Sequence, residues 1–345
     1  MNHAMTIDGF DNREFTVEEL TYAMSVIPNN YNLVTNLGLF GDPVPIAETY
    51  VGIEIDNGVL SILPTVERGG AATRGTQGKR KRMLVEVPHI PHEDEVKAAD
   101  IQGLRAFGSK APELLEDKVN QKLLTMTMKH QLTHEWYRVR ALQGEILDAD
   151  GSSMLDLHTM FGVTELAVAF GGASTINEYI RQVSRHIEDN LLGDVMSGVA
   201  CLCSPEFMEM LLTDTEVLAA YNAAAAANRL NPNMDDVRYS FYHMGVLFIE
   251  YRGQASVLNS DGTTTVRKFI PAGDARFVPL GTIQSAFSVA APGDFVEALN
   301  NPGELYYAKA ETMKFNRGLE LHTQSNFLPV WTRPACLVRG HTGAS

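Results

Sequence analysis

Residues 46–90 carry the pattern of a long two-stranded excursion. Apolar and polar positions alternate with a period of two at residues 49–55, which is typical of a half-buried strand. The Asp-Asn-Gly at residues 56–58 is a strong turn signal. Apolar runs at residues 59–64 and 83–90 then favour two further strands.

A period of three to four residues predicts one long helix from about residue 112 to about residue 143. Pro112 suits the first turn, the acidic residues that follow it complement the helix dipole, and Gly144 ends the helix. At 1.5 Å per residue such a helix is about 48 Å long, so it lies along a sheet or crosses an elongated domain. Its apolar stripe consists of Leu115, Val119, Leu123, Met126, His130, Tyr137 and Ala141.

Helix-start signals recur in the middle of the chain. Thr175 and Glu178 form a capping box, and Gly193 stands just past the end of the helix that they begin. The other elements expected in this part are a hairpin at 145–157, a strand within 161–170, a short helix from Ser204 and an alanine-rich helix at 216–227.

After Asp235 the pattern changes to strands. Residues 245–251 form a buried apolar run, and residues 259–262 are a turn. Further strands are expected at 275–281 and 328–338, where prolines suggest sheet edges. Separated helices and strand runs of this kind indicate the α+β fold class.

Residues 1–45 have the character of an arm. Thr16 and Glu19 predict a short capped helix, and residues 36–43 are apolar but interrupted by glycine. This segment cannot form a core alone, so we expect it to lie against something else. The apolar face of the expected helix is Val17, Leu20, Met24 and Ile27.

The composition is that of a globular protein, with 45% hydrophobic and 20% charged residues in 345. The apolar stretches are too short to span a membrane, and the first residues lack the basic start and apolar core of a secretory signal. Cys201, Cys203 and Cys336 are odd in number, and no second Cys or His pair follows at zinc-finger spacing. We therefore expect them to be buried, reduced thiols.

The net charge of −14 argues against a typical nucleic-acid binder. One segment reverses that sign, because residues 68–82 contain six basic residues and no acidic one. The segment also includes four glycines, so we expect a mobile loop tip. It is either a solvated loop or nucleic-acid patch, or a loop that reaches an acidic surface of another copy. Its basic residues are Arg68, Arg74, Lys79, Arg80, Lys81 and Arg82.

Motifs of catalysis are missing from the sequence. It has no GxxxxGK[ST] or GxGxxG phosphate loop, no GxSxG elbow and no HExxH. His130 and His134 lie one helical turn apart, but Glu135 follows the second histidine and no third ligand is evident, so packed histidines are expected. The Asp148-Ala-Asp-Gly-Ser fragment lacks the later residues of a calcium loop. We expect no catalytic residue, cofactor or metal, and no enzyme activity.

Short motifs in a particular order carry a resemblance that covers nearly the whole chain. They are Phe15-Thr16-Val17-Glu18-Glu19-Leu20, Leu37-Gly38-Leu39-Phe40, Lys79-Arg80-Lys81-Arg82, Val87-Pro88-His89-Ile90, Gly144-Glu145-Ile146-Leu147-Asp148-Ala149-Asp150-Gly151, Phe269-Ile270-Pro271, Ala275-Arg276-Phe277-Val278-Pro279-Leu280-Gly281 and Thr332-Arg333-Pro334-Ala335-Cys336-Leu337-Val338. In this order they resemble the major capsid proteins of lambda-like tailed phages, the capsid protein E family.

The resemblance implies an HK97-type capsid fold with an N-terminal arm, an extended E-loop, a peripheral domain with a long spine helix, and an axial domain. The implied divisions are the arm at 1–45, the E-loop at 46–100, the peripheral domain at 101–160, the axial domain at 161–310, and C-terminal strands at 311–345 that return to the peripheral domain. Contacts between copies are then expected from the basic E-loop residues and from Leu37, Leu39 and Phe40 of the arm.

The resemblance also implies a function. Hexamers and pentamers of the chain would form an icosahedral head around double-stranded DNA, without sequence-specific DNA binding and without a membrane. Scaffolding, portal and decoration proteins are further partners that it allows, with assembly in the host cytoplasm and a final place in the virion. The alternatives are an encapsulin-like compartment shell and an enzyme with an unrecognised site; assembly into shells separates both capsid-like functions from the enzyme.

Overall fold

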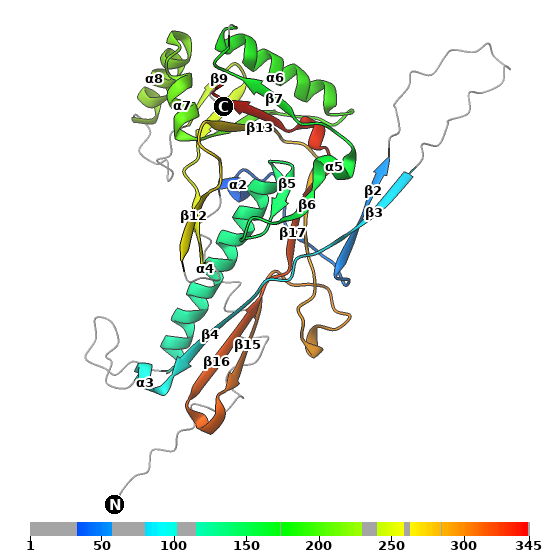
Figure 1. The fold of residues 1–345 in the computed structure, drawn as a ribbon, viewed down its shortest axis with the longest axis vertical. Helices are drawn as coiled ribbons and strands as arrows, with labels where there is room; N and C mark the ends of the chain where they lie inside the picture. Colours follow the sequence, from blue (N-terminus) through cyan, green and yellow to red (C-terminus); the bar gives the residue numbers. More distant parts are fainter. Residues whose placement is uncertain are drawn as a thin grey trace, which may run out of the picture.

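Helix α4, Leu115–Ala141, runs obliquely through the molecule and links its two ends (Figure 1). The structure is a computed structural model. It describes residues 33–56, 80–101, 115–172, 174–229, 240–258, 263–283 and 285–343.

One end of the molecule is a three-stranded sheet packed on the first half of α4. Its strands are β4 (Pro91–Lys97), β15 (Tyr307–Thr312) and β16 (Gly318–Gln324), in the order β15-β16-β4 and all antiparallel. Alternate residues of each strand face the helix, so this sheet is apolar on one side. The shared core includes Val96, Val119, Leu123, Met126, Leu319 and Leu321. The short helix α3 (Ala98–Ile101) follows β4, and the turn η3 (Lys314–Asn316) joins β15 to β16.

The other end is a six-stranded mixed sheet in the order β7-β18-β13-β8-β10-β9. Its strands are β7 (Leu166–Ala169), β8 (Gly198–Cys203), β9 (Ser240–His243), β10 (Val246–Glu250), β13 (Asp274–Leu280) and β18 (Val338–His341). Helices α6 (Ile176–Asn190), α7 (Pro205–Leu211) and α8 (Thr215–Arg229) lie at this end of the molecule (Figure 1).

Strand β8 shows why this sheet reads as continuously apolar. Cys201 and Cys203 pack with the residues of the helices, whereas Ala200 and Leu202 belong to the central core. Both faces of the strand are therefore buried, which removes the need for polar positions. The three cysteines are buried free thiols, as expected.

The central core joins the two ends. It contains the sheet of β1 (Val44–Pro45), β14 (Ala286–Ala290) and β17 (Phe327–Trp331), the helix α2 (Leu33–Asn36), and the last turns of α4. The hairpin of β5 (Glu145–Leu147) and β6 (Ser153–Asp156) and the helix α5 (Leu157–Phe161) also lie here. The short 3₁₀ helices η2 (Val296–Ala298) and η4 (Pro334–Cys336) interrupt the later strands.

Two further hairpins lie outside these sheets. One pairs β11 (Gln254–Leu258) with β12 (Thr264–Lys268). The other pairs β2 (Tyr50–Asp56) with β3 (Arg80–Glu86) and projects away from the body of the molecule (Figure 1). Among the described helices, none has the length and apolarity needed to cross a bilayer.

Most expected elements are confirmed, and helix α6 is confirmed in detail. The Thr175 hydroxyl accepts from the Glu178 amide, and the Glu178 carboxylate accepts from the Thr175 amide, which completes the capping box. The expected helix at 16–27, the strand at 59–64 and the turn at 259–262 lie outside the described residues.

The C-terminal segment differs from the prediction of one strand at 328–338. It contains β17, then η4, then β18, because Pro334 lacks the amide hydrogen that a continuing ladder requires. Within 161–170, the first residue still belongs to helix α5 and the strand β7 begins at Leu166. Strand β18 pairs with β7 and β13, so residues 311–345 do not return together to the sheet beside α4.

The prediction that prolines mark sheet edges is confirmed at Pro329 but not at Pro279. Pro329 lies on β17, which is an edge strand as expected. Pro279 lies on β13, an inner strand, so the prediction of an edge is wrong there. It is tolerated because the pairing of β13 with β18 stops at Phe277, which leaves one side of the strand unpaired at Pro279.

Candidate inter-subunit contact surface

The β2–β3 hairpin is buried on one face near its base and exposed on the opposite face. Ile53, Val85 and Val87 are buried in the central core, whereas Tyr50 and Leu84 keep 48% and 64% of their surface exposed. Large apolar side chains exposed on a projecting two-stranded ribbon are poorly protected in an isolated subunit. The hairpin therefore has the character of a segment that another molecule covers.

Those basic residues of the expected loop that the structure describes lie on β3. Arg80, Lys81 and Arg82 are its first residues, and Arg82 is exposed. The Arg82 guanidinium lies over Gly52 of β2, where a Cβ would meet its Nε at 2.5 Å. Arg68, Arg74 and Lys79 lie outside the described residues.

Two of the three expected arm contact residues lie in the subunit's own core. Leu39 and Phe40 are buried in the subunit's own core, and Leu37 packs against the same core. The Phe40 ring meets the Trp331 ring edge-on, with centroids 5.9 Å apart. Leu39 and Phe40 are covered by their own chain and stabilise the subunit, whereas half-buried Leu37 keeps surface that a neighbouring copy could contact.

A buried carboxylate, that of Glu135 on α4, holds the segment around Val34 against the subunit core. The Val34 amide donates to Glu135 Oε1 at 2.9 Å, and the Tyr251 hydroxyl donates to the same oxygen at 3.1 Å. Burial raises the pKa of Glu135, while these bonds and the nearby Arg138 oppose the rise. Sequence reasoning missed this role of Glu135, because its partner amide is 101 positions away.

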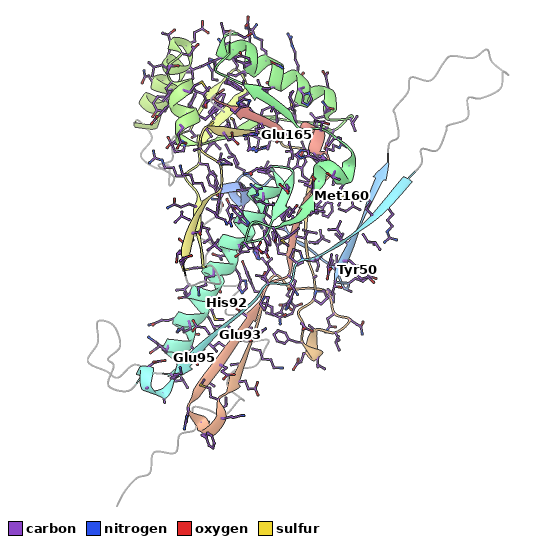
Figure 2. The ribbon with its side chains drawn as sticks, viewed as in Figure 1. Tyr50, His92, Glu93, Glu95, Met160 and Glu165 are labelled. Carbon is purple, nitrogen blue, oxygen red and sulfur yellow. The ribbon has the colours of Figure 1, made fainter. Side chains whose placement is uncertain are left out.

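The outer face of the β15-β16-β4 sheet is strongly acidic. Glu311, Glu320 and Glu95 stand directly opposite one another across the three strands, and Glu93 stands in the next row opposite His322. We call Glu93, Glu95, Glu311 and Glu320 the acidic face; Figure 2 shows Glu93 and Glu95 along β4. A groove of about 930 Å³ runs over it.

Like charges directly opposite in a sheet destabilise it, so the acidic face is unfavourable in the isolated subunit. Glu95 is paired with Lys97, and Glu93 lies 2.9 Å from His322. Among the described residues, neither Glu311 nor Glu320 has a cation within ion-pair distance. A second lysine of this face, Lys309, is engaged with Glu297 at 3.0 Å. The arrangement can therefore accept a cationic partner.

The paired histidines of α4 are packed in the core, as expected. His130 Nε2 lies 3.0 Å from the Thr323 hydroxyl and His134 Nε2 lies 2.7 Å from the Ser325 hydroxyl. Burial lowers the pKa of His130 to about 3 and holds that of His134 well below its usual value. In the part of the chain that the structure describes, no group of three His, Cys, Asp or Glu side chains is arranged to hold a metal.

A second polar network lies at the other end of the molecule, where Figure 2 shows Glu165. Arg339 on β18 donates to both carboxylate oxygens of Asp274 on β13, each at 3.0 Å. Arg276 is buried and pairs with Glu165. These contacts tie neighbouring strands to the segment before β7, and the sequence pattern did not predict them.

The fold matches a solved capsid structure over almost its whole length. The putative capsid protein of a prophage of Escherichia coli CFT073 superposes with a TM-score of 0.59 at 14% identity, covering 95% of this chain and 99% of that one. The profile of the phage major capsid protein E family matches residues 16–342. The chain belongs to this capsid protein E family. Its fold is the α+β, HK97-type capsid fold that the resemblance implied.

Curated relatives of this capsid protein agree. The major capsid protein of Pseudomonas phage KPP10 is 31% identical over 96% of this chain and 97% of its own length. The major capsid protein of Salmonella phage Felix O1 is 25% identical over 94% and 95% of the two chains. The family is one of phage shell proteins, which favours a phage head over a cellular compartment.

Proposed function

We propose that this capsid protein E family member assembles as hexamers and pentamers into the icosahedral head of a tailed phage, around double-stranded DNA. One observation carries the proposal beyond family membership: the β2–β3 hairpin projects from the body with Tyr50 and Leu84 exposed. Ordering such a ribbon is entropically costly unless a neighbour buries it. In a shell, every copy covers the hairpin of another.

The basic segment at residues 68–82 is the proposed partner of the acidic face of a neighbouring copy. It carries six positive charges and no negative one, against the four glutamates of that face. Exposed ion pairs contribute about 0.2–1 kcal/mol each, so they select the partner and its register rather than supply most of the affinity. The cohesion of the shell comes from apolar area buried at every repeat of the contact.

The rest of the proposal concerns the divisions of the chain and its other partners. Residues 1–45 would act as the arm, 46–100 as the E-loop, 101–160 as the peripheral domain and 161–310 as the axial domain. The chain's net charge of −14 supports enclosing DNA without gripping it. Assembly in the host cytoplasm, with scaffolding, portal and decoration proteins as partners, completes the proposed path to the virion.

The test of the docking step is a charge reversal. We expect the double variant Arg80→Glu and Arg82→Glu to fold normally but to form few or unstable shells, measured by sedimentation and electron microscopy of expressed protein. Arg181→Glu with Arg185→Glu is the matched control, because both arginines are exposed on α6 and the charge change is the same. If the Arg80 and Arg82 variant assembles as well as the wild type at low and high salt, the docking role is wrong.

A further inference from the structure

The turn between β15 and β16 exposes an aromatic side chain in an unfavourable backbone conformation. Phe315 has φ 63° and ψ 24°, and 86% of its surface is exposed. The next residue, Asn316, is also left-handed at φ 54°. Asparagine suits this region of backbone space, but a bulky aromatic residue does not. In the isolated subunit, Phe315 is therefore unfavourable in two ways: its backbone is strained, and its apolar ring is exposed to water.

A pocket lies beside the same turn, and the Phe315 ring of the same subunit is not part of its lining. Its volume is about 830 Å³, and its walls include Ala98 and Ala99 of α3 and Met313. Its charged lining consists of Glu311 and Glu320 and of Lys97, Lys314 and Arg317. The Phe315 ring instead faces the guanidinium of Arg317, 5.5 Å from the ring centroid.

We propose that Phe315 of one copy enters this pocket on the next copy in the shell; this rests on the assembly proposed above. The pocket is apolar at Ala98, Ala99 and Met313, which suits an aromatic ring. Lys314 and Arg317 flank Phe315 and also line the pocket, so its charges are mixed and the aromatic ring, rather than net charge, carries the contact. The pocket is larger than one ring, so the tip of the turn enters with it.

The placement of anchor and pocket defines the geometry of the contact. Both lie at the β15–β16 turn of one subunit, so a rotation axis that passes beside this turn brings each Phe315 to the pocket of the next copy. Such head-to-tail contacts close into a ring, in which every copy both donates an anchor and receives one. A strained and exposed aromatic residue then has a compensating contact in the assembled state, which the isolated subunit lacks.

The direct test is a cysteine pair, Phe315→Cys with Ala99→Cys. The native Cys201, Cys203 and Cys336 are buried, so they do not compete. Mild oxidation of assembled particles should give a ladder of covalently linked copies on a non-reducing gel, and each single-cysteine variant should give none. Particles that yield only unlinked chains, or links within one chain, overturn the proposal.

The second test separates the anchor from subunit stability. Phe315→Asn relieves the backbone conformation, so the melting temperature of the subunit should stay or rise, while each contact weakens about 30-fold, as for a hot-spot residue. Phe315→Leu keeps an apolar anchor and should restore part of the particle yield. The matched control is Leu192→Asn, since Leu192 is 76% exposed with φ 50° but lies on the loop after α6.

The outcomes distinguish this inference from the assembly on which it rests. If wild-type particles form and Phe315→Asn particles are equally abundant and stable, the anchor is wrong but the shell stands. An equal loss of particles in the Leu192→Asn variant also refutes the anchor, because the effect is then not specific to the pocket. If the wild type forms no particles even with its phage's other head proteins, the proposed assembly fails first.

Discussion

Acidification should destabilise the contact between α4 and the strands that pack on it, through two buried histidines. The Thr323 hydroxyl donates to the His92 carbonyl and the Ser325 hydroxyl to the Leu305 carbonyl, so each accepts from an imidazole Nε2. Nε2 of both imidazoles therefore carries a proton, and burial, which lowers the pKa of each, keeps the rings neutral. His134 is further enclosed by the Tyr306 and Phe327 rings, at centroid distances of 5.6 and 4.4 Å.

The sign and size of this change in stability with pH follow from proton linkage. Burial lowers the pKa of His130 to about 3 and that of His134 well below 6.5, whereas both titrate near 6.5 in the unfolded chain. The unfolded state therefore binds more protons below pH 6.5, and stability falls as the pH is lowered toward the folded pKa. From pH 7 to pH 5 the loss is about 2 kcal/mol for each histidine, about 4 kcal/mol for the pair.

Glu135 acts in the opposite direction. Burial raises its pKa, so the folded carboxyl takes up a proton before the unfolded one does, and acidification recovers part of the loss. Comparing the wild type with a variant that lacks both histidines separates their titration from that of Glu135 and of all other groups. In the double variant His130→Gln and His134→Gln, the amide nitrogen can still donate to each hydroxyl but no longer titrates.

The assay is urea unfolding of unassembled subunits at pH 7, 6 and 5. We expect the wild type to lose about 4 kcal/mol more than the double variant between pH 7 and pH 5. Equal dependence on pH in the two proteins would refute the reasoning, because it would mean that the buried imidazoles are not the groups that titrate.

Two further predictions concern stability. Phe40→Ala removes a ring packed on Trp331 and should lower the free energy of unfolding by about 3–5 kcal/mol, measured by urea titration; a loss below about 1 kcal/mol would mean that this segment is not part of the subunit core. Thr175→Ala removes the cap of α6 and should cost about 1 kcal/mol in the same assay, whereas Thr175→Ser should cost little. Equal losses in the two Thr175 variants would exclude the cap as the cause.

The local elements were largely predictable from the sequence. The stripe from Val119 to Ala141 and the capping box at Thr175 each depend on residues within a few turns, and periodicity and cap chemistry are local properties. The two strands of the β2–β3 hairpin were predictable for the same reason, since alternation is local, but their pairing with each other across residues 57–79 was not.

Contacts between distant segments were not predictable. The row of Glu95, Glu320 and Glu311 depends on the register of strands more than 200 residues apart, which no local pattern contains. The arm residues show the same gap. An apolar, glycine-interrupted segment such as Leu37–Phe40 has the same pattern whether it packs on its own subunit or on another, so burial against Trp331 had to come from the fold.

Cryo-electron microscopy of particles assembled from this chain is the most direct test of the proposed shell and of its docking contact. We expect closed icosahedral shells in which residues 68–82 of one copy contact the acidic face of a neighbouring copy. A chain that stays a compact monomer with its phage's other head proteins present would contradict the claim of a shell. Shells in which this segment packs on its own subunit would contradict the proposed docking.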